Sequence, residues 1–188
     1  MDIVLYVILG IFAIAGIWTW TNYNALVRLR NHCSEAWSNV DTELKRRYNL
    51  IPNLVESVKG YAKHEDQVIE SVIRARQEAL SGKGSVGDQA DNENVLVGSM
   101  KHLFAVAEAY PDLKASHNFL ELQKELANTE DRIQAARRFY NANVRDLNTR
   151  TEIFPSSMIA KKFGFTRQDY FQVEKIEIRE PVKVSLDK

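Results

Sequence analysis

The chain has 188 residues, and its 25 Lys and Arg residues balance 25 Asp and Glu residues to give a formal net charge of zero. This balance excludes a protein that binds nucleic acid non-specifically through a global basic field, and the length predicts a single folded core. One cysteine excludes an internal disulfide, while 8 glycines and 4 prolines favour helices over a β-sandwich or barrel that needs many tight turns.

An apolar segment of 18 residues without a charge, residues 3–20, lies at the N-terminus. At about 1.5 Å per residue, a helix of this length can cross the hydrocarbon core of a bilayer, which is about 30 Å thick. Aromatic rings and arginines near its ends are of the types found at headgroup depth. The sequence therefore predicts a signal anchor that contacts membrane lipids through residues 3–20, with interface residues Tyr6, Trp18, Trp20, Tyr23, Arg28 and Arg30.

A cleaved signal peptide is the alternative, because Ala13-Ile14-Ala15 has the small-x-small pattern of a cleavage site. Only Met1 and Asp2 precede the apolar run, however, and a signal peptide normally has a basic residue there. We therefore favour a retained anchor. The basic residues Arg28 and Arg30 follow the span, which favours a short N-terminus outside and the rest of the chain in the cytoplasm; the opposite orientation stays open.

Amphipathic helices are predicted after the anchor. No glycine or proline lies between Gly16 and Pro52, so we expect the membrane helix to continue as a stiff stalk. Its apolar positions recur at spacings of three and four, at Leu26, Leu29, Cys33, Ala36 and Val40. Pro52 disfavours helical geometry at Ile51 and suits a first helical turn, so we expect a new helix to start there.

Three more helices complete the predicted bundle. Apolar residues recur at spacings of three and four from Leu54 to Ala79, interrupted by Glu65, and this ladder predicts a helix. The helix is expected to end in the Gly/Ser loop 81–88. In this loop, Asp88 is a candidate cap for the next helix, which runs to Tyr110. The longest helix is expected from Pro111 to Pro155. We predict an all-α fold, an antiparallel up-down bundle of long helices with coiled-coil-like seams. The predicted division is an anchor at 1–21, a four-helix bundle at 22–154 and a short aromatic-rich C-terminal extension at 155–188.

The C-terminal extension concentrates aromatic residues, at Phe163, Phe165, Tyr170 and Phe171. Apolar and charged residues then alternate, which is typical of a short strand or an extended tail, with the apolar members at Ile176, Ile178, Val182 and Val184. We expect this extension to pack over the end of the bundle, and the alternative is a strip that docks a partner.

No catalytic or metal-binding motif is complete. His64-Glu65 lacks the second histidine of a zinc-protease helix, since Val68 occupies that position, and Gly82–Ser85 lacks the strand and Ser/Thr of a phosphate loop. Cys33 falls on an apolar seam, where a buried thiol is expected. We therefore predict no enzyme activity, no cofactor and no metal. Three polar seam residues, Glu65, Thr129 and Asn143, are expected to set helix register or to face solvent.

Four basic clusters are candidates for binding anionic lipid: 45–47, 74 with 76, 137–138 and 161–162. Lys45 would lie about 37 Å along a helix from Trp20, beyond electrostatic reach of the headgroups. The sequence Glu130-Asp131-Arg132 has the mixed charge of a solvated helix face.

Several longer motifs resemble those of the LemA family. They are Arg46–Val55, Gly60–Glu65, Ala107–Leu113, Thr129–Ile133 and Ala136–Asn141, extended by Asn148, Phe154-Pro155 and Phe163–Phe165. The resemblance implies a bacterial membrane protein with one N-terminal span, a short N-terminus outside and a long-helix bundle. The family also includes a protein involved in building magnetosome membranes, and the resemblance supplies no catalytic residues.

Our leading hypothesis is a single-pass, membrane-anchored interaction or scaffold protein of the bacterial inner membrane that acts in the cell envelope or in membrane organisation. It predicts unidentified protein partners, leaves a homo-oligomer open and predicts no nucleic-acid partner. The alternatives are an accessory factor of a membrane protease or envelope-stress system and, more remotely, a hydrolase that uses Glu65.

Overall fold

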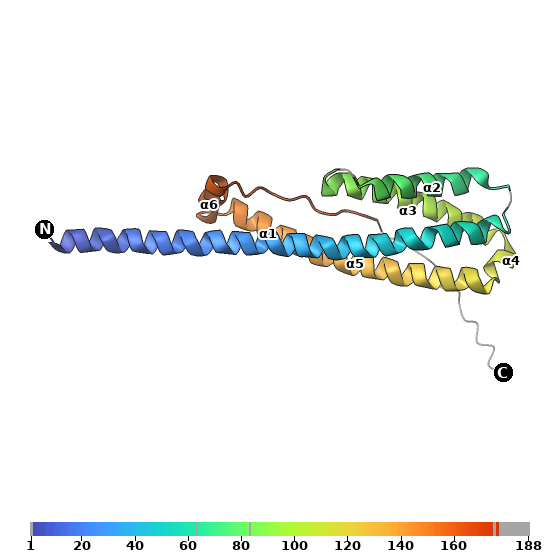
Figure 1. Cartoon of the computed structure of the whole chain (residues 1–188), viewed down its shortest axis with the longest axis horizontal. Helices are drawn as coiled ribbons and strands as arrows, with labels where there is room; N and C mark the ends of the chain where they lie inside the picture. The colour runs from blue at the N-terminus through green and yellow to red at the C-terminus, as the bar shows by residue number, and fades with distance from the viewer. Residues whose placement is uncertain (1, 63, 83, 175, 177–188) are drawn as a thin grey trace, which may run out of the picture. The chain divides into compact units, whose positions relative to one another are not determined.

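The computed structural model describes residues 2–62, 64–82, 84–174 and 176. Its secondary structure is helical, and no strand occurs in these residues, which confirms the predicted all-α class. The elements follow one another as α1 (Asp2–Lys59), α2 (Asp66–Ser81), α3 (Val86–Glu108), α4 (Pro111–Lys114), α5 (His117–Glu152) and α6 (Ser156–Phe163) (Figure 1).

The helix α1 is continuous over 58 residues and confirms the predicted stalk. The expectation that a new helix starts at Pro52 is wrong, because α1 passes through this proline and ends at Lys59. A proline inside a helix cannot donate to the carbonyl four residues earlier, here that of Tyr48. The Nε atom of Arg76 on α2 donates to this carbonyl oxygen instead, at 2.7 Å. A long-range hydrogen bond thus replaces the local one.

Two other predicted helices are divided. The ladder from Leu54 to Ala79 spans a turn between α1 and α2, where Ala62 is buried and its N–H donates to the Val58 carbonyl at 2.8 Å. The segment after Pro111 forms the short helix α4 before α5 begins. The backbone carbonyl of Ser116 accepts the first hydrogen bond of α5, from the Leu120 N–H at 3.1 Å, as expected for the residue that precedes a helix.

The loop between α2 and α3 ends in a capping box. Ser85, and not the predicted Asp88, is the N-cap of α3: its Oγ accepts from the Asp88 N–H, and the Asp88 carboxylate accepts from the Ser85 N–H at 2.7 Å. These Ser85 donors lower the pKa of Asp88. Gly82 closes α2 with a φ of 49°, a left-handed conformation that favours glycine.

The chain forms two compact units. The first contains α1 up to Ser38, α5 from Phe139, α6 and the chain to Tyr170. Its helices are joined by Trp37 and Tyr140, whose rings lie 5.3 Å apart, and by a 2.9 Å hydrogen bond from Arg150 to Asn22. Its core includes Leu26, Cys33, Ala36, Val144, Leu147 and Ile159.

The second unit contains α1 from Asn39, α2, α3, α4, α5 to Arg138 and the described tail from Phe171. Short connections bring these amphipathic helices together as a bundle, with α2 packed against α3 (Figure 1). Its core is aliphatic and includes Val40, Leu44, Ile51, Leu54, Val58, Val72, Leu96, Met100, Leu103, Leu113, Leu126 and Ile133. The predicted boundaries at 21/22 and 154/155 stay a prediction.

The chain after α6 is extended and is held by asparagines. In the first unit, Asn148 donates to the Gln168 carbonyl and accepts from the Gln168 N–H, both at 2.9 Å. In the second unit, Asn94 bonds in the same way to the Gln172 carbonyl and the Glu174 N–H.

In the described part of the extension, Phe171, Val173 and Ile176 are buried, while packing over the end of the bundle stays a prediction. Ile176 lies in no strand, and the other members of the predicted strand, Ile178, Val182 and Val184, lie outside the described residues.

Candidate functional site

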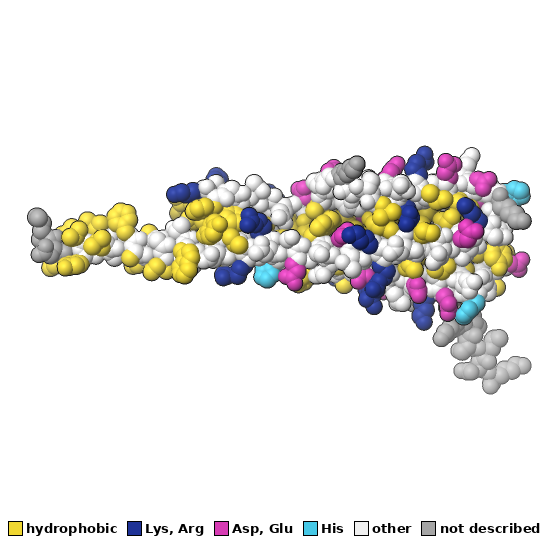
Figure 2. Space-filling model, viewed as in Figure 1, with side chains coloured by type: hydrophobic (Ala, Val, Ile, Leu, Met, Phe, Trp, Pro, Cys, Tyr) yellow, Lys and Arg dark blue, Asp and Glu magenta, His cyan; other side chains and the backbone are white. Residues whose placement is uncertain are grey.

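The N-terminal part of α1 exposes an unbroken apolar surface. Its 18-residue window has a mean hydropathy of 2.2, and none of the window is buried against the rest of the chain. Figure 2 shows hydrophobic side chains along this part of α1 with no charged side chain among them. A buried core helix would be covered by its own protein, and this surface is not covered by the described part of the chain. By length and composition, the helix can cross a membrane.

The predicted interface residues all lie on this helix and are all exposed: Tyr6, Trp18, Trp20, Tyr23, Arg28 and Arg30. Their contact with lipid stays a prediction. Two of them, Tyr23 and Arg30, belong to an aromatic cluster. The other members of this cluster come from the C-terminal extension, so the sequence alone did not predict it. The ring of Tyr23 packs edge-on against Phe163 at 4.9 Å and Phe165 at 5.8 Å, and the Arg30 guanidinium lies 5.3 Å from the Phe165 ring centre.

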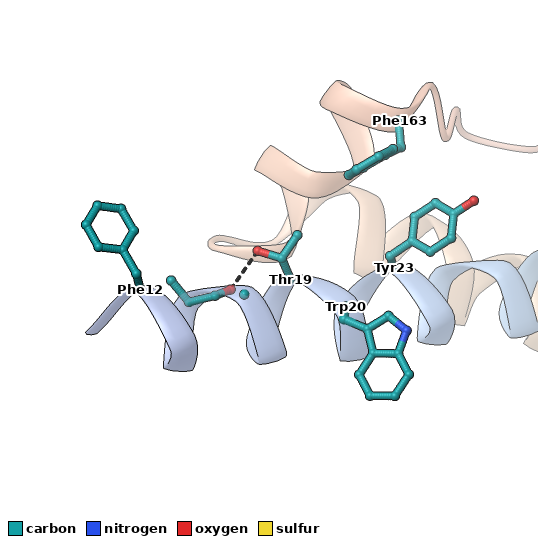
Figure 3. Close-up of a pocket in the computed structure, with 7 residues that line it drawn as sticks. Phe12, Thr19, Trp20, Tyr23 and Phe163 are labelled. Carbon is teal, nitrogen blue, oxygen red and sulfur yellow. Dashed lines mark hydrogen bonds between the residues drawn. The ribbon is translucent and has the colours of Figure 1, made fainter. Parts of the chain in front are cut away.

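An open, mainly apolar hollow lies beside this cluster, between α1 and the end of α6. It is lined by Phe12, Ala15, Gly16, Thr19, Trp20, Tyr23 and Phe163. Figure 3 shows Phe163 and Tyr23 on the same side of α1, while Trp20 points away from α6. The Thr19 hydroxyl donates to the Ala15 carbonyl at 2.8 Å, so its polar group is satisfied within α1. The hollow therefore presents an apolar surface beside the C-terminal end of the predicted span.

The second unit contains a buried charged cluster around Arg47 of α1. Its guanidinium bonds to Glu93 of α3 and, at 2.8 Å, to Glu130 of α5, and all three side chains are almost completely excluded from solvent. Tyr48 donates to Glu93, as does Gln89 at 2.8 Å. One cation thus joins three helices of the bundle.

The cluster keeps its arginine charged and its tyrosine neutral. Burial would lower the pKa of Arg47, but Glu130 and Glu93 outweigh it, so the pKa lies above its ordinary value. Burial and the Glu93 carboxylate raise the pKa of Tyr48 well above its usual range. Because these groups have almost no exposed surface and bond to one another, the arrangement suits the specification of helix register.

The structure corrects two sequence interpretations here. Arg47 is not part of an exposed basic cluster, and Glu130 is not on a solvated face, since both are buried. The physical reason is their position on the helix: Arg47 falls between Leu44 and Ile51 at spacings of three and four, on the buried seam. That spacing indicates a buried position and can be seen in the sequence. The charged neighbours of both residues favoured the interpretation of an exposed surface instead.

Each of the polar seam residues has its own hydrogen-bond partner. Thr129 is buried and its hydroxyl donates within α5 to the Glu125 carbonyl at 2.8 Å, and Asn143, a member of the other unit, donates to the Phe139 carbonyl at 2.9 Å. Glu65 lines a hollow with His102 and Tyr110, whose hydroxyl lies 3.4 Å from its carboxylate. A hydrolase that uses Glu65 would therefore have Tyr110 beside that carboxylate.

Within the described ranges, no group of three or more His, Cys, Asp or Glu side chains could hold a metal ion. Cys33 is buried, and burial followed by the charge of Asp146 raises the pKa of its thiol. A raised pKa disfavours the thiolate, so this cysteine is poorly suited to act as a nucleophile.

The fold and these sites define an all-α protein with an exposed apolar N-terminal helix, a buried ionic cluster and a tail held by asparagines. A sequence profile of the LemA family matches residues 36–186. The chain belongs to the LemA family, which confirms the resemblance of its motifs.

Named relatives agree with this assignment. Protein LemA of Metamycoplasma hominis is 27% identical over 157 residues, which cover 82% of this chain and 70% of that protein. Magnetosome protein MamQ of Magnetospirillum gryphiswaldense is 25% identical, covering 79% of this chain and 64% of the relative. Magnetosome protein MamQ 2 of Paramagnetospirillum magneticum is 27% identical, with 80% and 64% covered. The chain thus spans about two thirds of the length of these relatives.

Proposed function

We propose that this protein is a single-pass membrane anchor joined to a helical interaction module, in which α1 serves as the tether. The observation that carries the proposal is the fully exposed apolar window at the start of a helix that continues without a break to Lys59. The proposed location is the bacterial inner membrane, with the two units in the cytoplasm. The proposed activity of the protein is binding to protein partners. The buried charged cluster is inaccessible to a substrate, which argues against a reaction at that cluster.

One of the named relatives belongs to an organelle. MamQ is named as a protein of the magnetosome, and 79% of this chain aligns with it at 25% identity. We propose that this chain organises proteins at a membrane of the cell envelope, through the exposed helix faces of its two units.

The anchor is tested by placing charges in the middle of the apolar window. An Ile11→Arg/Phe12→Arg variant of the full chain should leave the membrane fraction in an alkaline wash, because each arginine costs about 2.5–3.5 kcal/mol at a helix centre in a bilayer. Asn31→Arg/Ser34→Arg, which places two arginines at exposed positions outside the window, is the matched control and should stay membrane-bound. Wild-type protein that stays soluble without detergent would refute the anchor.

The interaction role is tested by crosslinking in intact membranes. A photo-activated crosslinker at an exposed position of the second unit, such as Val95 or Ile73, should capture the same protein reproducibly. The same crosslinker at a buried position, such as Leu103, is the matched control and should capture nothing. Equal capture at both positions, or capture of no protein at any exposed position, would contradict an interaction module.

A further inference from the structure

We propose that α6 and the corner that precedes it form a second membrane contact, an interfacial element that docks on the bilayer surface beside the span. This inference rests on the proposed anchor and extends it, because it assigns lipid binding to a segment about 140 residues away in sequence. The occupant is the headgroup and upper acyl-chain region of a phospholipid bilayer.

The first argument is depth. The apolar window from Ile3 to Trp20 spans about 27 Å at 1.5 Å per residue, close to the thickness of the hydrocarbon core, so the core ends near Trp20. Phe163 packs on Tyr23, less than one helical turn further, and lines the hollow with Thr19 and Gly16 (Figure 3). Because all these residues belong to one compact unit, the end of α6 lies at headgroup depth.

The second argument is the surface that this region exposes. Its buried side faces its own unit through Ser156, Ile159 and Ala160. Its outer side exposes four large apolar side chains, namely Ile153 (47%), Phe154 (79%), Met158 (61%) and Phe163 (48%). Apolar side chains gathered in one short segment cost free energy in water and are stabilised when they enter the interface.

The third argument is charge. Lys161 and Lys162 are exposed beside Phe163 in the last turn of α6. Long lysine side chains can place their ammonium groups among lipid phosphates while the neighbouring apolar groups enter the acyl region. A short amphipathic helix with this composition, adjacent to an apolar span, matches the chemistry of an interfacial helix.

The experiment uses the full chain in vesicles of phosphatidylcholine and phosphatidylglycerol, with Cys33 replaced by alanine and single cysteines carrying an environment-sensitive fluorophore. The labelled positions are Phe154→Cys and Met158→Cys in the proposed contact, Leu9→Cys in the span and Ser81→Cys at an exposed end of α2. Lipids brominated near the glycerol should quench the fluorophore at both 154 and 158 at least three-fold more than at 81. Quenching at 9 by lipids brominated deeper in the chain reports the anchor separately.

Quenching at 9 together with values at 154 and 158 equal to that at 81 would overturn the second contact and leave the anchor intact. No quenching at 9 would refute the anchor and the contact that rests on it. A Lys161→Glu/Lys162→Glu variant should reduce quenching at 158, whereas the control Lys114→Glu/Lys124→Glu, which changes the same net charge in the second unit, should not. Equal quenching in both variants would refute the role of the lysines.

Discussion

The Nε atom of Arg76 lies 2.7 Å from the carbonyl oxygen of Tyr48, the acceptor that Pro52 leaves without its backbone donor. A buried carbonyl without a donor costs about 1–3 kcal/mol. Tyr48 is buried, so the arginine on α2 compensates for a proline inside α1. The contact also ties α1 to α2 beside the Arg47 cluster.

The first prediction is a double-mutant cycle. Arg76→Ala should lower the free energy of unfolding by about 1–3 kcal/mol, because it leaves the Tyr48 carbonyl without a donor. In a Pro52→Ala background the backbone N–H of residue 52 can donate to that carbonyl, so the same substitution should cost clearly less. Urea unfolding followed by circular dichroism in detergent micelles measures both costs.

Arg74→Ala is the matched control, since Arg74 is exposed on the same helix, and its effect should stay within about 0.5 kcal/mol. If Arg76→Ala costs the same in both backgrounds, the compensation does not exist.

The second prediction concerns the buried cluster. Arg47→Met removes the cation that faces Glu93 and Glu130, and should destabilise the protein by about 3–5 kcal/mol because carboxylates are left in a dry core. Arg46→Ala is the control, because Arg46 is about half exposed and lies 3.6 Å from Glu43. This substitution should lower the free energy of unfolding by less than about 1 kcal/mol.

A variant without buried charge separates this effect from lost packing. Arg47→Met/Glu93→Gln/Glu130→Gln should regain much of the stability in the same urea titration. A triple variant no more stable than Arg47→Met would show that the guanidinium acts by volume and not by charge.

These two contacts show which features can be predicted from sequence. The apolar run and the three-four ladder from Leu26 to Val40 predict α1 because both are local patterns. The passage of α1 through Pro52 depends on Arg76, 24 positions away, and the neutralisation of Arg47 depends on glutamates 46 and 83 positions away. A ladder identifies the buried position of Arg47, but only the fold supplies its partners.

The candidate membrane surface shows the same division. The span and its aromatic ends are visible in the sequence, since uncharged length is a local property. Phe163 and Tyr23 lie 140 residues apart in the sequence, so their contact could be found only from the structure.

The third prediction concerns the tail of the first unit. Asn148→Asp keeps an acceptor for the Gln168 N–H but removes the donor to the Gln168 carbonyl and places two acceptors together. The segment around Arg167 should open more readily, and trypsin cleavage after Arg167 should accelerate about five-fold or more. Asn143→Asp is the control, because the Asn143 amide donates within its own helix, to the Phe139 carbonyl. Equal cleavage of both variants would contradict a holding role for Asn148.

The fourth prediction is a pH dependence from Tyr140, whose hydroxyl donates to the Asp169 carbonyl at 3.0 Å. Burial, followed by the nearby Cys33 and Asp169, raises the pKa of Tyr140 to about 12, above the ordinary value of 10.0. A folded pKa above the unfolded value means that this contribution is fully present below pH 10 and is lost as pH rises toward 12.

Tyr140→Phe should therefore be less stable than wild type by about 0.5–1.5 kcal/mol at pH 8, and the difference should shrink between pH 10 and pH 12. Parallel urea titrations at several pH values measure this difference, and the groups that titrate in both proteins cancel. A difference that grows or stays constant above pH 10 would contradict the raised pKa.

The fifth prediction concerns the orientation of the proposed anchor, because Arg28 and Arg30 after the apolar run favour the two units in the cytoplasm. A reporter cysteine belongs at Ser81 and not at Gly82 or Gly84, because Gly82 has a φ of 49° and a Cβ at Gly84 would lie 2.5 Å from the Asp88 carboxylate. In intact cells, Ser81→Cys should resist a membrane-impermeant maleimide.

The same variant should react once the membrane is opened by detergent below the unfolding concentration. Native Cys33 serves as the internal control, because its thiol is buried and its raised pKa disfavours the thiolate, so it should react only after unfolding. Labelling of residue 81 in intact cells, with Cys33 unlabelled, would place the units outside the cytoplasm and reverse the proposed topology while leaving the anchor itself in place.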